Sequence, residues 1–136
     1  MKKFLFTLTL LAACSMVAKA DIQFNHGPWQ EILSQATKEK KLVFVDAYTT
    51  WCGPCKWMAA NTFTNPEVAD FFNANFINAK IDMENGEGVG IAEKYNVKAY
   101  PTLLFVAGNG ELVHVAVGAL DPEKVLALGK QVADPG

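Results

Sequence analysis

The order of apolar and polar residues predicts a domain in which helices and strands alternate. Apolar residues spaced at i, i+3, i+4 and i+7 indicate a helix with one buried face, formed by Trp29, Ile32, Leu33 and Ala36. The unbroken apolar run of residues 42–45 indicates a strand that is covered on both faces. Together these patterns are typical of a sheet flanked by helices.

Capping residues and alternation locate the other elements. Asn65 followed by Pro66 has the sequence of a helix N-terminus. Helices are available for both sheet faces, so the expected fold class is an α/β sandwich with a mixed sheet. The expected elements are a short strand at 22–24, a helix from 29, a strand at 42–45, helices at 52–61 and from 66, a strand at 77–82, a helix at 89–95, a strand at 102–106, a hairpin turn at 108–110, a strand at 112–117 and a last helix from 122.

The first 20 residues have the pattern of a secretory signal. Two lysines precede an apolar run at 4–13, and residues 18–20 offer small side chains for cleavage. The apolar run is short for a membrane span, and an apolar helix retained in the fold is the alternative. The expected organisation is a signal peptide at 1–20 and one domain at 21–136.

A lipobox is a competing interpretation of the same stretch. Residues 11–14, Leu-Ala-Ala-Cys, resemble the bacterial sequence in which the cysteine is lipidated and becomes the mature N-terminus. Cleavage after Ala20 would release the protein into the periplasm or the exterior, whereas lipidation of Cys14 would anchor it to a membrane. We favour release, because a soluble-type cleavage site follows and Cys14 lies early in the chain.

Composition argues against nucleic-acid binding. The chain has 12 basic and 14 acidic residues and no arginine. Removal of residues 1–20 takes away three lysines, which leaves 9 basic and 14 acidic groups and a net charge of −5. Such a chain has no basic stripe for a phosphate backbone. A length of 136 residues suits one domain, which we expect to be a monomer.

The Cys-x-x-Cys pair is the strongest chemical signal. A strand-like run leads through a short turn into Trp51-Cys52-Gly53-Pro54-Cys55, which places Cys52 at the start of a helix. The unpaired N–H groups and partial positive charge of a helix N-terminus favour a thiolate there. Gly53 lets the turn close, and Pro54 fits the first turn because it has no N–H to lose. We expect Cys52 to attack substrates and Cys55 to be the more buried sulfur.

The same cysteine spacing also occurs in metal sites. Zinc requires four ligands, and the chain contains no second Cys-x-x-Cys or Cys/His pair to complete them. His26 and His114 lack the i, i+4 spacing of a ligand pair, so we expect both to be solvated and His114 to point outward from its strand. Copper(I) held by the two cysteines and a histidine remains the metal alternative. We expect no cofactor.

Asp46 is the candidate proton-transfer group. It ends an apolar strand six residues before Cys52. A carboxyl buried without a full partner has a raised pKa and can exchange a proton near neutral pH. The alternative is a strand-end aspartate that forms hydrogen bonds in a turn.

The chain resembles the thioredoxin superfamily over residues 21–136. The resemblance implies a three-layer α/β/α sandwich with a central mixed five-stranded sheet and a substrate groove beside the cysteines. The helix restart at 63–68 is more similar to exported thioredoxin-like proteins, including the C-terminal reductase domain of DsbD, than to small cytosolic thioredoxins. The residues that carry the resemblance are Asp46, 51–56, Lys80, Tyr100, Pro101, Thr102, Gly118 and Ala119.

The resemblance also implies roles for individual residues. Asp46 would assist deprotonation of Cys55, with Lys80 beside it, and Pro101 would be a cis proline against the cysteine pair. Core packing is the alternative for Trp51, and a simple strand end is the alternative for Gly118. The substrate-binding residues implied by the family are Trp51, Gly53, Pro54, Tyr100, Pro101 and Gly118.

The expected function is an exported thiol–disulfide oxidoreductase that mainly reduces protein disulfides. The Gly-Pro pair between the cysteines resembles the strongly reducing members of the superfamily. The alternatives are a disulfide oxidant or isomerase, a copper carrier, and a binding module without turnover. The expected partners are protein disulfides and, from the family comparison, a DsbD-type membrane electron donor.

Overall fold

The computed structural model describes residues 2–5, 7–12 and 21–134. Cys14 and the expected cleavage site at 18–20 lie outside the described residues. Within those ranges, no helix has both the length and the hydrophobicity needed to cross a bilayer. The elements are α1 (Trp29–Glu39), β1 (Leu42–Tyr48), α2 (Gly53–Asn61), α3 (Pro66–Asn75), β2 (Phe76–Asp82), α4 (Glu87–Lys94), β3 (Thr102–Val106), β4 (Leu112–Val117) and α5 (Pro122–Ala133).

The strands form one mixed sheet in the order β2-β1-β3-β4. β1 pairs in parallel with β2 and antiparallel with β3, and β3 pairs antiparallel with β4. The register places Asp46 of β1 between Lys80 of β2 and Leu103 of β3. The central strand β1 therefore carries the candidate acid at its carboxyl end, beside the turn that leads to the cysteines.

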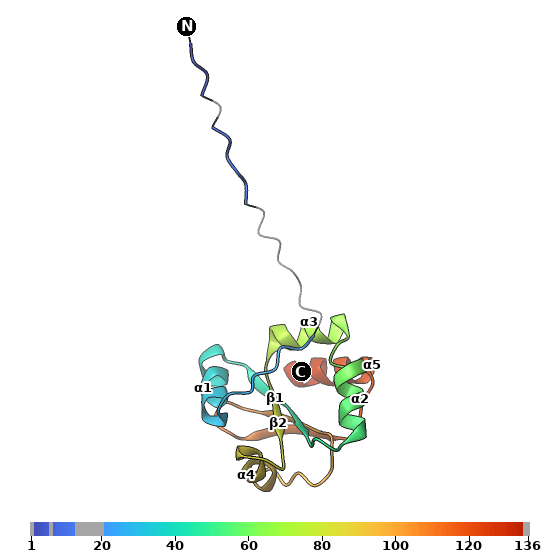
Figure 1. Cartoon of the computed structure of the whole chain (residues 1–136). Coiled ribbons are helices and arrows are strands. Elements are labelled where there is room, and N and C mark those ends of the chain that lie inside the picture. Colours follow the sequence, from blue (N-terminus) through green and yellow to red (C-terminus); the bar gives the residue numbers. More distant parts are fainter. Residues whose placement is uncertain (1, 6, 13–20, 135–136) are drawn as a thin grey trace.

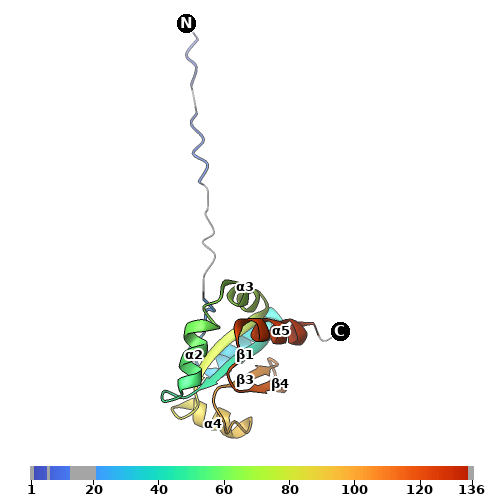
Figure 2. The same ribbon diagram turned by 90° about the vertical axis from the view of Figure 1, so that its right-hand side faces the viewer.

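Helices cover both faces of the sheet, which confirms the expected three-layer thioredoxin fold. α1 and α4 pack on one face, called here the α1/α4 face, and α2, α3 and α5 pack on the opposite α2/α3/α5 face. Figures 1 and 2 show α3 and α5 above the sheet and α4 below it. The α2/α3/α5 face buries a cluster of interlocking rings, namely Phe44, Phe63, Phe72, Phe76 and Phe105.

The expected fifth strand at 22–24 is not formed. The segment makes a single bridge, from Asn25 to Ala79 of β2. Its other backbone donors bind elsewhere: the N–H of Ile22 donates to the carbonyl of Phe63 at 3.0 Å, and the N–H of Gln23 donates to the side chain of Asn73 at 2.8 Å. Because these hydrogen bonds go to residues outside the sheet, the segment forms no strand and packs on the α2/α3/α5 face.

Local capping explains why the chain begins a new helix after α2. The side chain of Asn65 accepts hydrogen bonds from the N–H groups of Glu67 and Val68, at 3.0 and 3.1 Å, and Pro66 takes the first helical position. This N-terminus was predicted from the sequence. α4 begins at Glu87 and ends at Lys94, slightly earlier than the expected helix at 89–95.

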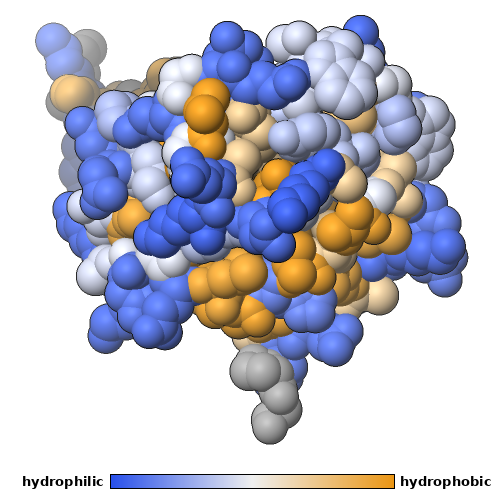
Figure 3. Space-filling model, turned by 90° about the horizontal axis from the view of Figure 1, so that it is seen from below, coloured by the Kyte–Doolittle hydropathy of each residue, from blue (hydrophilic) through white to orange (hydrophobic). Residues whose placement is uncertain are grey.

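The orientation of β4 differs from the prediction. His114 is half-buried and its ring lies 6.3 Å from that of Phe105, so it faces the α2/α3/α5 layer and does not point outward. Val113, Val115 and Val117 are exposed, because α1 and α4 do not extend over this edge strand. Figure 3 views the molecule from below, the side on which α4 lies in Figure 1, and shows hydrophobic groups among hydrophilic ones on that surface.

Candidate active site

Cys52 occupies the N-cap position of α2, as expected. The backbone N–H of Cys55 donates to the Cys52 sulfur over 3.1 Å, and the two residues are joined by a disulfide with their Cα atoms 5.3 Å apart. Pro54 lies in the first turn of the helix. A sulfur at this position accepts one of the N–H groups that the helix start leaves unpaired, and the same contact can stabilise a thiolate.

The expected contrast in burial between the cysteines is absent in the oxidised protein. Cys52 is 2% exposed and Cys55 is 5% exposed. Gly53 and Pro54, by contrast, are exposed, and a Cβ added to Gly53 would meet no atom within 4 Å. The dipeptide between the cysteines therefore forms open surface, and the distinction between attacking and resolving sulfur rests on their positions in the helix.

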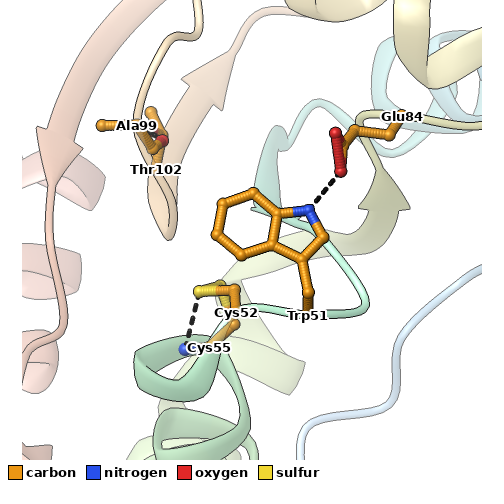
Figure 4. The surroundings of a disulfide bond; sticks show 6 residues. All are labelled: Trp51, Cys52, Cys55, Glu84, Ala99 and Thr102. Atoms are coloured by element: carbon orange, nitrogen blue, oxygen red, sulfur yellow. Dashed lines mark hydrogen bonds between the residues drawn. A yellow bond between two sulfur atoms is a disulfide. The ribbon is translucent and has the colours of Figure 1, made fainter.

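Trp51 lies on the surface beside the disulfide. Its side chain is 66% exposed, so it is not a core residue. The indole N–H donates to the carboxylate of Glu84 in the loop after β2, and the indole meets the ring of Tyr100 edge-on, with centroids 6.1 Å apart. Figure 4 shows the indole reaching from the turn before α2 toward Glu84, with the disulfide beside it. These contacts hold an apolar surface at the rim of the site.

The loop before β3 contributes the other part of the rim. The Tyr100–Pro101 peptide bond is cis, as the resemblance implied. The carbonyl of Pro101 accepts a hydrogen bond from the N–H of Gly118 at 2.8 Å, which joins this loop to the end of β4. Gly118 has a φ of 101°, a conformation that favours glycine. The hydroxyl of Thr102 donates to the carbonyl of Ala99 and closes the loop (Figure 4).

Asp46 is buried on the α2/α3/α5 face without a hydrogen-bond partner. It is 1% exposed, and neither carboxyl oxygen has a partner among the described residues. Burial raises the pKa of Asp46 to about 6, and the charge of Lys80 acts in the opposite direction. The carboxyl can therefore gain and lose a proton near neutral pH, as required of a group that assists a thiol.

Lys80 does not form an ion pair with Asp46, although the two residues are cross-strand neighbours. Its ammonium lies over the ring of Tyr48, 4.9 Å from the centroid. Tyr48 is half-buried at the end of β1. Its pKa is raised by burial and by the charges of Asp82 and Asp46, so the phenol stays neutral at physiological pH.

Two residues of this site were missing from the sequence prediction. Tyr48 follows Asp46 by two positions, and strand alternation signals that both lie on one sheet face. Glu84 lies in a polar loop and gives no comparable signal, since its contact with Trp51 joins residues 33 positions apart. No three His, Cys, Asp or Glu side chains are grouped as metal ligands within the ranges 2–5, 7–12 and 21–134.

Comparisons with known proteins agree with this geometry. The thioredoxin family matches residues 21–130. Thioredoxin-2 of Pyricularia oryzae is 40% identical over 68% of this chain, a match that spans half of that protein. Thioredoxin H3 of Arabidopsis thaliana is 34% identical over 75% of this chain and 80% of its own length.

Solved structures give the same result. A solution structure of a candidate disulphide-isomerase from Bacteroides thetaiotaomicron is 48% identical, with a TM-score of 0.75 over 88% of this chain and 99% of that one. The reduced C-terminal domain of Neisseria meningitidis DsbD is 26% identical, with a TM-score of 0.62 over 75% of this chain and 91% of that one.

The fold and its Cys52–Cys55 disulfide define a thiol–disulfide oxidoreductase. The chain belongs to the thioredoxin family.

Proposed function

We propose that the protein is exported and acts mainly as a reductase of protein disulfides. The observation that carries the direction is the electrostatic setting of the cysteines. The Cys52 sulfur accepts the N–H of Cys55, while the intervening Gly53 and Pro54 bring no charged side chain. Asp46 lies on the sheet face that α2 covers, and its negative charge disfavours a thiolate there. A less stabilised reduced form makes a dithiol a stronger reductant.

The reaction is a two-electron exchange. The Cys52 thiolate attacks one sulfur of a substrate disulfide, which forms a mixed disulfide and releases the other substrate sulfur as a thiolate. Cys55 then loses its proton and attacks the Cys52 sulfur. The Cys52–Cys55 bond forms, the second substrate sulfur leaves as a thiolate, and both substrate thiolates take protons from water. The substrate gains the two electrons that the dithiol loses.

Asp46 is the proposed acceptor of the Cys55 proton. It has the raised pKa that this role requires, and neither of its carboxyl oxygens has a hydrogen-bond partner among the described residues. Cys55 lies at the start of α2, which packs on the same face. A carboxylate there lets Cys55 become a thiolate only when the mixed disulfide is ready to be resolved.

The rim supplies the proposed contact with the substrate. Trp51 and Tyr100 present aromatic surface, and beside them the backbone of Pro101 is hydrogen-bonded to that of Gly118. An extended polypeptide can lie along this stretch of backbone and bring its disulfide to Cys52.

The redox potential tests the direction. Equilibration of the purified mature protein with glutathione buffers, followed by quantification of free thiols, gives the potential of the Cys52–Cys55 pair. We expect a value near that of thioredoxin, about −270 mV. A value near the oxidising end, about −120 mV, would contradict the proposal. Cys52→Ser should abolish the reduction of insulin.

A trapping variant tests the mechanism. In Cys55→Ala the mixed disulfide cannot be resolved, so substrates stay attached to Cys52. Adducts that reducing agent releases, and that disappear in Cys52→Ser/Cys55→Ala, are the expected result. A complete lack of such adducts in extracts that contain exported proteins would count against turnover and favour a binding role.

Isomerisation is a second candidate, because the Bacteroides thetaiotaomicron protein described as a disulphide-isomerase is 48% identical. Refolding of a scrambled disulfide protein separates the two activities. An isomerase restores the activity of the scrambled substrate in glutathione buffer and needs only Cys52. A reductase needs both cysteines and an electron supply.

Export and electron supply need separate tests. Mass spectrometry of the mature protein made in a bacterial host should find Asp21 at the N-terminus, and a diacylated Cys14 there would mean a membrane anchor.

The donor we propose is a DsbD-type membrane protein. The protein should accumulate in the oxidised form in cells that lack such a donor, and an unchanged thiol fraction would exclude it.

A further inference from the structure

The second charged residue of the site occupies an unexpected position. Lys80 lies directly across from Asp46 in the β1–β2 register, yet its ammonium sits over the ring of Tyr48, one pair further along the sheet. Diagonal neighbours in a sheet are within reach of long side chains. The 4.9 Å separation from the centroid is within the range of a cation–π contact. The ammonium therefore lies on the ring and forms no ion pair with Asp46.

The position of this ammonium matters because Asp46 has no other partner. Both carboxyl oxygens are buried and unpartnered in the described residues. Burial disfavours the carboxylate, and Lys80 is the charge that offsets it. If the Lys80 side chain were free to extend into water, its charge would lie further from Asp46 and would be screened by the solvent. It would then lower the pKa of Asp46 by less.

The other groups near Lys80 and Asp46 bring no second positive charge to this face. Asp82, the next acidic residue along β2, acts on Tyr48 together with Asp46. From α2, Cys55 is the titratable residue buried on this face. The residues that α3 and α5 bury there are apolar, or glycine in the case of Gly129. Lys80 is thus the cation that faces Asp46.

We propose that Tyr48 is a positioning residue: its ring holds the Lys80 ammonium beside Asp46 and so sets the pH at which Asp46 accepts the proton of Cys55. The inference rests on the proposed proton-transfer role of Asp46. The face of the Tyr48 ring holds Lys80, and the hydroxyl is not needed, because the neutral phenol carries no charge that could act on Lys80 or Asp46. The proton passes from the Cys55 sulfur to a carboxyl oxygen of Asp46 and then to water.

The matched variants are Tyr48→Phe, which keeps the ring, and Tyr48→Leu, which removes it. In the oxidised protein, carbon-13 NMR of labelled aspartate carboxyls follows the titration of Asp46, whose signal is identified by its absence in Asp46→Asn. We expect the Asp46 midpoint to rise by about half a pH unit or more in Tyr48→Leu and to stay within about 0.2 unit of the original protein in Tyr48→Phe. This measurement does not depend on redox direction or export.

A double-variant cycle identifies the route of the effect. In Lys80→Met the Asp46 midpoint should rise, and adding Tyr48→Leu should then cause no further change. An equal shift with and without Lys80 would mean that Tyr48 acts through packing alone, and would overturn the proposal. A shift in Tyr48→Phe as large as that in Tyr48→Leu would overturn it too.

The catalytic consequence has its own readout. Insulin reduction by Tyr48→Leu should be about twofold slower at pH 6 and unchanged at pH 8, where Asp46 is ionised in either protein. A loss that is equal at both pH values indicates damage to the structure and contradicts the proposal. If the NMR shifts appear but insulin is not reduced by the original protein, the proposed function fails while the positioning role stands.

The original protein provides a test that needs no stable variant. Aliphatic protons held over an aromatic face are displaced upfield, so the Hε protons of Lys80 should be shifted upfield from the other lysines. Unshifted Hε protons would show that the ammonium does not rest on the ring, and would overturn the proposal even if Tyr48→Leu fails to fold.

Discussion

The two faces of the sheet differ in what they bury and in how completely they are covered. The α2/α3/α5 face carries the phenylalanine cluster and, among the described residues, the one buried charged side chain, Asp46. The α1/α4 face is built mainly from aliphatic side chains and Trp29, and it leaves Val113, Val115 and Val117 of β4 exposed.

The difference indicates what the chemistry requires. Exclusion of water raises the pKa of a carboxyl group, and interlocking rings provide a dense, dry environment. Phe44 lies two residues before Asp46 on the same face of β1, and its ring contacts those of Phe63, Phe72 and Phe105. Among the described residues, the α1/α4 face buries no charged side chain, so its core depends less on the exclusion of water and its edge at β4 is left uncovered.

The largest expected effect is the loss of the central ring. Phe44→Ala should lower the free energy of unfolding by about 3–5 kcal/mol, because it removes a fully buried side chain that the surrounding rings cannot replace. Urea unfolding of the oxidised protein measures it. Phe44→Leu, which retains most of the volume, is the control and should cost clearly less. A loss in Phe44→Ala below about 1 kcal/mol would mean that the cluster is not tightly packed.

Removal of the buried charge should stabilise the protein at neutral pH. Folded Asp46 has a pKa of about 6 against an ordinary 3.8, so between these values the folded state holds more protons than the unfolded state. Stability from this group is full below about pH 4 and falls as the pH rises through 6, by about 3 kcal/mol in total.

Asp46→Asn should therefore unfold at higher urea than the original protein at pH 7, with the difference shrinking toward pH 4. Unfolding series at pH 4, 5, 6 and 7 give this difference, with the exposed Asp70→Asn on α3 as the control. A difference that does not vary with pH would contradict the assignment of a raised pKa to Asp46.

A polar atom introduced under α1 should be costly. Val45 and Val115 belong to the same cross-strand row, on either side of Leu104, but only Val45 is covered by a helix. Val45→Thr should lower the free energy of unfolding by about 1–3 kcal/mol, because the new hydroxyl is buried without a partner. Thermal or urea unfolding measures this. A cost near zero would show that water reaches the covered part of this face.

The smallest effect is expected at the uncovered end of that row. Val115 is 45% exposed, so Val115→Thr should change the free energy of unfolding by no more than about 0.5 kcal/mol. Threonine also suits a strand. The same unfolding assay tests this expectation. A loss as large as that of Val45→Thr would mean that β4 is covered in solution and that the two faces do not differ in how completely they are covered.

Local patterns predicted most of the elements and the central pair of the site. The Asn65-Pro66 cap, the Gly108–Gly110 turn and the helix start at Cys52 depend on neighbours in sequence, and each was confirmed. The expected strand at 22–24 was wrong, because a strand depends on a distant partner and here the backbone donors bind Phe63 and Asn73.

Contacts between distant residues required the tertiary structure. The alternation in β4 distinguishes two sets of side chains, but either set can face inward, and the position of α1 and α4 decides that His114 is half-buried and the valines are exposed. The placement of Lys80 on Tyr48 and of Trp51 against Glu84 likewise depends on how strands and loops meet in space. Periodicity and capping are local properties of a chain, whereas burial and charge pairing arise only when distant segments pack together.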